Sequence, residues 1–245
     1  MDLSRSNSST SLNNLDKRNN IGHHDIQKTY IRPMIVVTGG IKGGSGKTTI
    51  ATHLAAMRSQ QDKDILLVDA DDQETSSDFS TLRNSLDDEL SQYTCVKLSG
   101  KSVRSELIKL QSKYTDIIVD AGGRDTINQR AALSVADSLI VPFVPRSFDL
   151  WTLDNVASIV EEIKQINPQL HSYAFLNRAD SRGYDNNEAR ELIKENDNLK
   201  ILDVTICNRK AFSNAAAAGK IVNEVKNPDS KAIFEIQNLY NCIFN

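Results

Sequence analysis

The chain has 245 residues, of which 39% are hydrophobic and 25% are charged, and its formal net charge at neutral pH is −3. This composition provides enough apolar residues for one sizeable core. The slightly acidic balance excludes a protein that coats nucleic acid through its overall charge, so such a partner would need a local basic patch. The three cysteines, Cys95, Cys207 and Cys242, are far apart and predict neither a disulfide framework nor a cysteine-built zinc site, which favours a cytoplasmic protein.

The first residues of the chain differ in composition from the rest. Residues 1–31 are rich in serine and asparagine and offer almost nothing to pack, so we expect a flexible N-terminal tail. They contain no apolar leader segment, and we find no stretch that approaches the roughly 18 apolar residues of a membrane-spanning helix. We therefore predict one domain over residues 32–245 and no membrane partner.

From Pro33 onward, short apolar runs alternate with amphipathic stretches. Apolar runs without polar alternation are typical of strands that are buried on both faces, as in a parallel sheet. The predicted strands are 34–37, 65–68, 117–119, 139–144, 173–176 and 201–204, and the predicted helices include 48–60, 103–114, 127–136, 150–166 and 186–195. This alternation predicts an α/β fold, a doubly wound and mostly parallel sheet flanked by helices, with ligands bound beyond the carboxyl ends of the strands.

The segment after the first predicted strand carries the strongest signal for a ligand. It reads Gly39-Gly40-Ile41-Lys42-Gly43-Gly44-Ser45-Gly46-Lys47-Thr48-Thr49 and leads directly into a predicted helix. Glycine amides and a helix N-terminus can surround a phosphate, Lys47 can bind the β- and γ-phosphates, and the Thr48 hydroxyl can bind magnesium. The segment therefore predicts a P-loop, with nucleotide-binding residues Gly43, Gly44, Ser45, Gly46, Lys47, Thr48 and Thr49.

Carboxylates follow two further predicted strands. The second strand ends in Asp69-Ala70-Asp71-Asp72, and the third ends at Asp120. A carboxylate at the end of a buried strand beside a P-loop can hold a magnesium-bound water, which is the role we predict for Asp120, and Asp71 can orient an attacking water. The alternative, that these acids cap helices or are solvated, stays open and weighs most for Asp72.

Together these segments resemble a known family. Lys42-Gly43-Gly44-Ser45-Gly46-Lys47-Thr48, Asp69-Ala70-Asp71 and Val119-Asp120-Ala121-Gly122 are similar to the deviant Walker A, A′ and B motifs of the ParA/MinD family. The resemblance implies a P-loop NTPase fold, Mg²⁺-dependent hydrolysis of ATP, and a homodimer that sandwiches the nucleotides.

The resemblance also implies roles for individual residues. Lys42 would reach the phosphates of the partner subunit while Lys47 serves its own, so that hydrolysis depends on the dimer. The implied catalytic residues are Lys42, Lys47 and Asp71, the metal ligands are Thr48 and Asp120, and Asn177 is implied to lie at the adenine. However, Asn177-Arg178-Ala179-Asp180 also resembles the guanine-reading N-K-x-D motif of GTPases, so the choice of base stays open.

Two loops depart from the family pattern. Members of the family usually have proline where Asp72 stands, and often have prolines where Gly122 and Gly123 stand. The glycines predict a mobile segment after the third strand.

Relatives in this family differ mainly in the surface that the dimer binds. Partition ATPases bind nonspecific DNA. Such binding would require a local patch of basic residues on this chain. The candidate DNA-binding residues are Arg209, Lys210, Lys220 and Lys226. By contrast, residues 230–245 lack the basic residues of a membrane-binding helix, so we expect their apolar side to pack in the core.

The leading hypothesis is a nucleoid-associated, ParA-type partition ATPase, whose DNA-bound dimer is released when a ParB-like adaptor stimulates hydrolysis. The alternative is a MipZ- or MinD-like ATPase that positions the division site. A metabolic P-loop enzyme is a further class, but an iron–sulfur carrier needs cysteines at a dimer interface, and none lies between Asp120 and Cys207. For an amide-bond ligase, the sequence identifies no substrate pocket.

Overall fold

The computed structural model describes residues 33–86, 90–145 and 152–245. The tail expected at residues 1–31 and the first residues of the helix expected at 150–166 lie outside these ranges. Within them, seven parallel strands form one sheet in the order β3-β2-β4-β1-β5-β6-β7. The strands are β1 (Met34–Thr38), β2 (Ile65–Ala70), β3 (Thr94–Lys97), β4 (Asp116–Ala121), β5 (Ser138–Phe143), β6 (His171–Ala179) and β7 (Lys200–Cys207).

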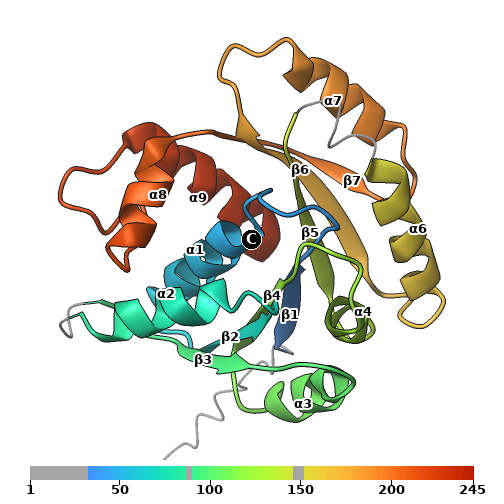
Figure 1. Cartoon of the computed structure of the whole chain (residues 1–245), viewed down its shortest axis with the longest axis horizontal. Coiled ribbons are helices and arrows are strands. Elements are labelled where there is room, and N and C mark those ends of the chain that lie inside the picture. Colours follow the sequence, from blue (N-terminus) through green and yellow to red (C-terminus); the bar gives the residue numbers. More distant parts are fainter. Residues whose placement is uncertain (1–32, 87–89, 146–151) are drawn as a thin grey trace, which may run out of the picture. The chain divides into compact units, whose positions relative to one another are not determined.

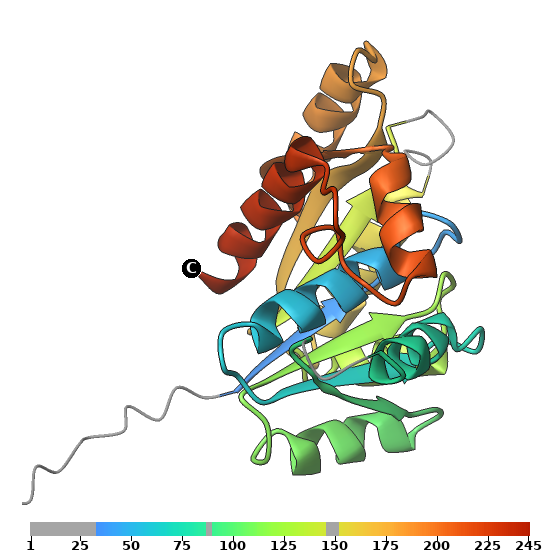
Figure 2. The same cartoon turned by 90° about the vertical axis from the view of Figure 1, so that its left-hand side faces the viewer.

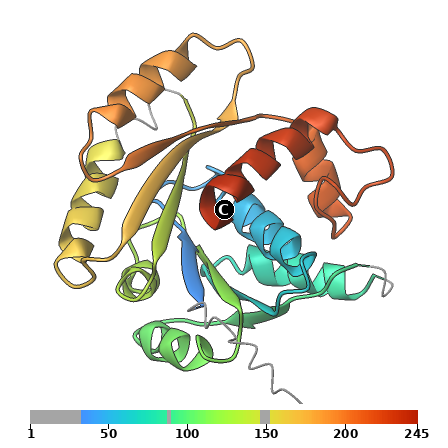
Figure 3. The ribbon, with the colours of Figure 1, turned by 180° about the vertical axis from the view of Figure 1, so that it is seen from behind.

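Helices cover both faces of the sheet, as Figures 1 and 3 show from opposite sides. One layer contains α1 (Lys47–Ser59), α2 (Thr75–Asn84), α8 (Lys210–Ala217) and α9 (Ser230–Phe244). The other contains α3 (Ser102–Leu110), α4 (Ile127–Leu133), α6 (Leu153–Lys164) and α7 (Asp185–Lys194). None of the helices in the described ranges is both long and apolar enough to cross a membrane.

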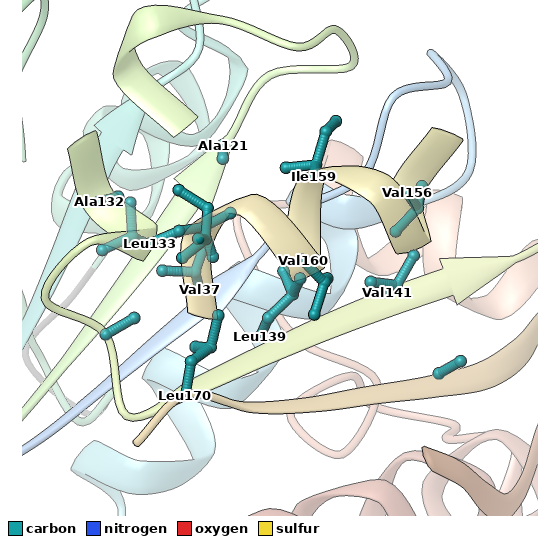
Figure 4. Packing of buried hydrophobic residues seen from close by; sticks show 14 of the residues in the cluster. Val37, Ala121, Ala132, Leu133, Leu139, Val141, Val156, Ile159, Val160 and Leu170 are labelled. Atoms are coloured by element: carbon teal, nitrogen blue, oxygen red, sulfur yellow. The ribbon is translucent and has the colours of Figure 1, made fainter. Parts of the chain in front are cut away.

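The apolar strands supply a separate core to each layer. Along β1, Ile35 and Val37 belong to the core beneath α3, α4, α6 and α7, whereas Val36 belongs to the core beneath the other layer. This two-sided burial explains why the strands read as continuous apolar runs. Figure 4 shows the first core, where α4 and α6 pack on the central strands through residues that include Val37, Leu139, Val141, Val156, Ile159 and Val160.

The last helix joins the second core. Side chains of α9 that the sequence placed on one apolar side, among them Ile236, Leu239 and Tyr240, are buried in that core. Figure 2 shows α9 beside α1, and Arg58 of α1 donates a hydrogen bond to the Tyr240 hydroxyl over 3.3 Å. The expectation that this helix packs in the core is therefore confirmed.

The α/β fold class and the six predicted strands are confirmed, but three elements, α2, β3 and α8, were missed. The helix α8 has the sequence KAFSNAAA, which contains one large apolar residue. The helix α2 has the sequence TSSDFSTLRN, which contains only two large apolar residues. The strand β3 lies at the edge of the sheet, and its residues are exposed or half-buried. None of the missed elements carries the continuous apolar run or the helical apolar periodicity from which strands and helices were predicted.

Candidate nucleotide-binding site

Four strands, β1, β2, β4 and β6, bring the predicted motifs together at the carboxyl edge of the sheet. Asp120 on β4 is the register partner of Thr38 on β1 and of Asp69 on β2. From β6, the buried Asn177 donates its side-chain amide to the Ser45 carbonyl over 2.6 Å. Parallel packing thus places the P-loop, the acidic strand ends and the predicted base-contacting residue in one site.

The P-loop has the backbone conformation that its glycines allow. Gly44 and Gly46 have φ values of 75° and 96°, and Gly46 precedes the first residue of α1. A side chain at Gly46 would collide with the Asn177 amide. Only glycine at position 46 therefore allows the loop to turn into α1 while Asn177 contacts Ser45. In this conformation the N-terminus of α1 is available to a phosphate.

Two residues of α4 that the sequence did not point to support the site, Gln129 at the P-loop and Asn128 at the end of β2. The Gly40 amide donates to the Gln129 side-chain oxygen over 3.0 Å, and the adjacent Asn128 donates to the Ala70 carbonyl over 3.0 Å. Both side chains are buried. Their signal in the sequence was a pair of amide side chains at the start of a helix that directly follows the Walker B-like segment.

Lys47 is a buried cation that is held in place by the loop itself. Its ammonium group donates to the Lys42 carbonyl over 2.8 Å. Burial lowers the pKa of Lys47, and the charges of Asp120 and Asp71 offset that effect only in part. A polyphosphate would supply the negative charge that this burial leaves uncompensated. Lys42 lies half-buried in the same loop.

Asp120 is a fully buried carboxylate whose oxygens form no hydrogen bond with a described residue. Burial raises the pKa of Asp120 to about 7, and the nearby Thr48 hydroxyl opposes this rise without reaching hydrogen-bond geometry. An orphaned buried carboxylate next to a P-loop is a group whose partner is supplied by a ligand.

The residues at this position fit Mg²⁺. The ion prefers oxygen ligands, keeps several waters and uses one or two carboxylates together with substrate phosphates. Asp120 and Thr48 offer a carboxylate and a hydroxyl beside the phosphate-binding loop. The described part of the chain contains no group of three or more acidic, histidine or cysteine side chains suited to a metal, so phosphate oxygens would have to complete the coordination.

The neighbouring acids Asp69 and Asp71 differ in role: Asp69 accepts backbone hydrogen bonds, and Asp71 lines the cleft. Asp69 is buried and accepts hydrogen bonds from the Asp71 and Ser77 amides, over 3.2 and 2.8 Å, at the start of α2. Its carboxylate therefore orders the loop and the helix, which is the alternative that the sequence left open. Asp71 is half-buried, accepts from the Gln73 amide over 3.2 Å and lines the cleft.

Gly122 and Gly123 allow close packing around Asp71 and the P-loop. A Cβ atom at Gly122 would lie 3.0 Å from an Asp71 carboxylate oxygen, and one at Gly123 would lie 2.9 Å from the Gly43 backbone. The sequence suggested only mobility for these glycines, but their close approach to the loop is a second physical reason for them.

Two adjacent cavities could accommodate a nucleotide. A cleft of about 740 Å³ is lined by most of the predicted phosphate-site residues, namely Gly43, Gly44, Gly46, Lys47, Thr48, Thr49 and Asp71. A second cavity of about 470 Å³ is lined by Asn177 and Phe212, among others. Gly46, Thr49 and Arg178 line both, so the two cavities meet at the start of α1.

The four predicted DNA-binding cations differ in whether they form ion pairs within the protein. Arg209 forms a short ion pair with Glu235 over 2.6 Å and lies 3.7 Å from Asp229, which commits its guanidinium to contacts with α9 and its N-cap. The other three candidates, Lys210, Lys220 and Lys226, form no ion pair with a described residue. Lys210 and Lys226 are exposed and Lys220 is half-buried. A DNA-binding surface at these residues stays a prediction, and Lys210, Lys220 and Lys226 are its members without an ion pair to a described residue.

The sequence matches a family model described as the CobQ/CobB/MinD/ParA nucleotide binding domain over residues 35–222. A relative from Halothiobacillus neapolitanus, named maintenance of carboxysome distribution protein A, is 25% identical over 211 residues, which cover 84% of this chain and 94% of the relative.

Among solved structures, a Cyanothece McdA variant in complex with ATP has a TM-score of 0.69 at 16% identity, covering 86% of this chain and 96% of that one. A putative plasmid partition protein from Borrelia burgdorferi bound to AMPPNP has a TM-score of 0.65 at 19% identity, covering 86% of this chain and 98% of that one. At these identities the likeness concerns the fold.

A parallel sheet whose first strand leads through a glycine-rich loop into a helix, with buried acids at the neighbouring strand ends, defines a P-loop nucleotide-binding protein. The family match covers most of this domain, and the chain belongs to the CobQ/CobB/MinD/ParA nucleotide-binding family. The resemblance to the ParA/MinD family is thereby confirmed.

Proposed function

We propose that the chain is a ParA-type positioning ATPase. ATP binding closes a homodimer, the dimer binds nonspecific DNA of the nucleoid, and hydrolysis releases it. The observation that carries the proposal is the convergence on one P-loop site of a buried lysine, a half-buried carboxylate and an orphaned buried carboxylate, Lys47, Asp71 and Asp120, with Lys42 in the same loop. A binding module without hydrolysis would not require this set.

The proposed chemistry is transfer of the γ-phosphoryl group to water. Lys47 and the amides at the start of α1 bind the phosphates, and Asp71 accepts a hydrogen bond from the water that attacks the γ-phosphorus, while ADP leaves. Mg²⁺, held by Thr48 and Asp120, neutralises charge on the phosphates. Lys42 contributes a second cation across the dimer, so that hydrolysis requires two subunits.

Adenine is the base proposed for this site. The Cyanothece neighbour was solved with ATP and the Borrelia neighbour with AMPPNP, which supports an adenine nucleotide. Asn177 suits this base, because the hydrogen bond to Ser45 uses one of its two amide N–H donors and leaves its side-chain oxygen to accept from the exocyclic amine of adenine.

The cargo is proposed to be attached through an adaptor protein that stimulates hydrolysis, as expected of a ParB-like partner. The name of the Halothiobacillus relative favours a carboxysome as cargo, and the Borrelia neighbour favours a plasmid. Positioning of the division site is the second candidate, and it would also use a DNA-bound dimer, because the apolar side of α9 is buried in the core rather than free for a membrane.

Sedimentation velocity with AMPPNP or ADP, together with phosphate release at increasing protein concentration, tests this switch. We expect a dimer with AMPPNP only, and a specific activity that rises with concentration. Lys42→Ala should lose both properties, while Lys113→Ala, which removes an exposed lysine outside the cleft, should retain them. A monomer in every nucleotide state, or activity independent of concentration, would contradict the proposal.

A further inference from the structure

Arg178 occupies an unusual place beside the P-loop. It follows Asn177 near the end of β6, and its φ of 50° lies in the left-handed region that non-glycine residues rarely adopt. Its guanidinium donates a hydrogen bond to the Gly44 carbonyl over 2.6 Å. The side chain thus crosses from the strand end to the P-loop, and the surrounding structure maintains a backbone conformation that would otherwise be unfavourable.

The guanidinium of Arg178 has N–H donors that are not used in its hydrogen bond to Gly44. Several arginines in the described ranges are engaged by carboxylates, namely Arg58, Arg83, Arg130, Arg190 and Arg209. Arg178 pairs with no carboxylate of the described residues, and the Gly44 carbonyl uses only one of its five N–H donors. A cation that is held at a P-loop without a protein counter-ion suits an anionic ligand.

The two cavities beside Arg178 indicate which part of a bound nucleotide would lie next to this residue. Arg178 lines the cleft of about 740 Å³ and the cavity of about 470 Å³, which share only Gly46 and Thr49 besides. A nucleotide with its base beside Asn177 and its terminal phosphates beside Lys47 must pass this junction. The parts of a nucleoside polyphosphate between the base and the β-phosphate are the ribose and the α-phosphate.

We propose that Arg178 binds the α-phosphate of the nucleotide. It is the side-chain cation for the inner phosphate, whereas Lys47 serves the outer two. The inference rests on the nucleotide-dependent function proposed above and deepens it. Because ADP and ATP share the α-phosphate, Arg178 contributes equally to the binding of both, and it sets affinity for the nucleotide rather than the choice between its two states.

Two substitutions separate phosphate binding from support of the loop. In Arg178→Gln the charge is lost, and a shorter side chain that ends in an amide donor remains beside the loop. In Arg178→Lys the charge remains and the planar fork is lost. Arg182→Gln is the matched control, because this exposed arginine lies four residues further on and lines none of the cavities described.

Calorimetric titration of the full chain with Mg²⁺-ADP and Mg²⁺-AMPPNP tests the inference. We expect Arg178→Gln to weaken both ligands by about tenfold to a hundredfold, with their ratio unchanged, Arg178→Lys to lose less, and the control to match wild type. Wild-type affinity in Arg178→Gln would show that the residue only supports the loop and would overturn the inference, as would a loss confined to AMPPNP. If the wild type binds neither ligand, the proposed function fails as well.

Discussion

Asp69 and Asp120 are register partners on adjacent strands, yet the protein satisfies only one of them. Asp69 accepts two backbone N–H groups, whereas neither oxygen of Asp120 has a partner among the described residues. Two acids that look alike in the sequence therefore have different roles. One orders the loop between β2 and α2, and the other is available to a ligand.

This contrast predicts stability changes of opposite sign. At pH 8 and without Mg²⁺, Asp120→Asn should raise the free energy of unfolding by roughly 1–3 kcal/mol, because burial disfavours the charged carboxylate. Asp69→Asn should lower it by about 1 kcal/mol, because one acceptor oxygen is replaced by a donor. Urea unfolding measures both changes.

The same pair provides a ligand readout. Asp120→Asn should abolish the additional thermal stabilisation that Mg²⁺ gives to the ADP-bound protein, while Asp69→Asn should retain most of it. An Asp120→Asn protein that still responds to Mg²⁺ would contradict the assignment of Asp120 to the metal.

His53 predicts how stability depends on pH. It is buried on α1 between the Thr49 carbonyl and the Val222 amide, and burial lowers its pKa to about 4. The unfolded chain, with a histidine pKa near 6.5, binds this proton more readily than the folded one. The contribution of neutral His53 is therefore complete above about pH 6.5 and is lost as the pH falls towards 4, by roughly 2–3 kcal/mol.

Urea unfolding of wild type and His53→Gln between pH 4 and pH 7.5 checks this dependence. Other groups also titrate in this range, so the quantity to compare is the difference between the two proteins. It should shrink as the pH falls. A constant difference would show that His53 does not titrate as its surroundings indicate.

A buried ion pair connects α2 to the segment that carries Lys220. Arg83 binds the Glu224 carboxylate through both terminal nitrogens, over 2.7 and 2.8 Å, and also contacts the Gly219 carbonyl at 3.4 Å. Arg83→Met should destabilise the protein by about 3–5 kcal/mol, because it leaves Glu224 buried without its partner.

Adding Glu224→Gln to Arg83→Met should recover part of that loss, since the second substitution removes the uncompensated charge. Chemical unfolding of the two single variants and the double variant forms the cycle. Strict additivity of the two single effects would contradict the coupling.

The lysine patch predicts a difference between two sets of substitutions. Replacement of Lys210, Lys220 and Lys226 by glutamine should weaken binding to nonspecific duplex DNA and reduce its dependence on salt. Arg209→Gln should instead lower thermal stability, because its guanidinium holds Glu235. Filter binding across a salt series, with melting temperatures of all variants, separates the outcomes, and unchanged DNA binding in the triple variant would exclude this surface.

The chemistry of the site was more readable in the sequence than its scaffold. That Lys47, Thr48 and Asp120 lie close together could be predicted, because a P-loop and buried strand ends impose a fixed order on the chain, while their roles stay proposals. Asp69 could not be separated from Asp120, because both follow apolar runs, and only α2, which the sequence did not reveal, shows where the Asp69 carboxylate is used.

Contacts between distant segments were also beyond the sequence pattern. Gln129 supports Gly40 across 89 residues, and Arg178 reaches Gly44 across 134. Such pairs depend on the strand order and on side-chain direction, neither of which periodicity encodes. The pairing of Arg209 with Glu235 belongs to the same group of contacts, and nothing in the sequence indicated that this predicted DNA-binding cation is ion-paired.

Binding of the purified full-length chain to nonspecific duplex DNA, with ATP and with ADP, tests the central claim most directly. We predict binding with ATP that falls steeply with salt, little binding with ADP, and loss of the ATP-dependent binding in Lys42→Ala. Equal binding in both nucleotide states, or no binding in either, would contradict the account of a nucleotide-controlled dimer that acts on DNA.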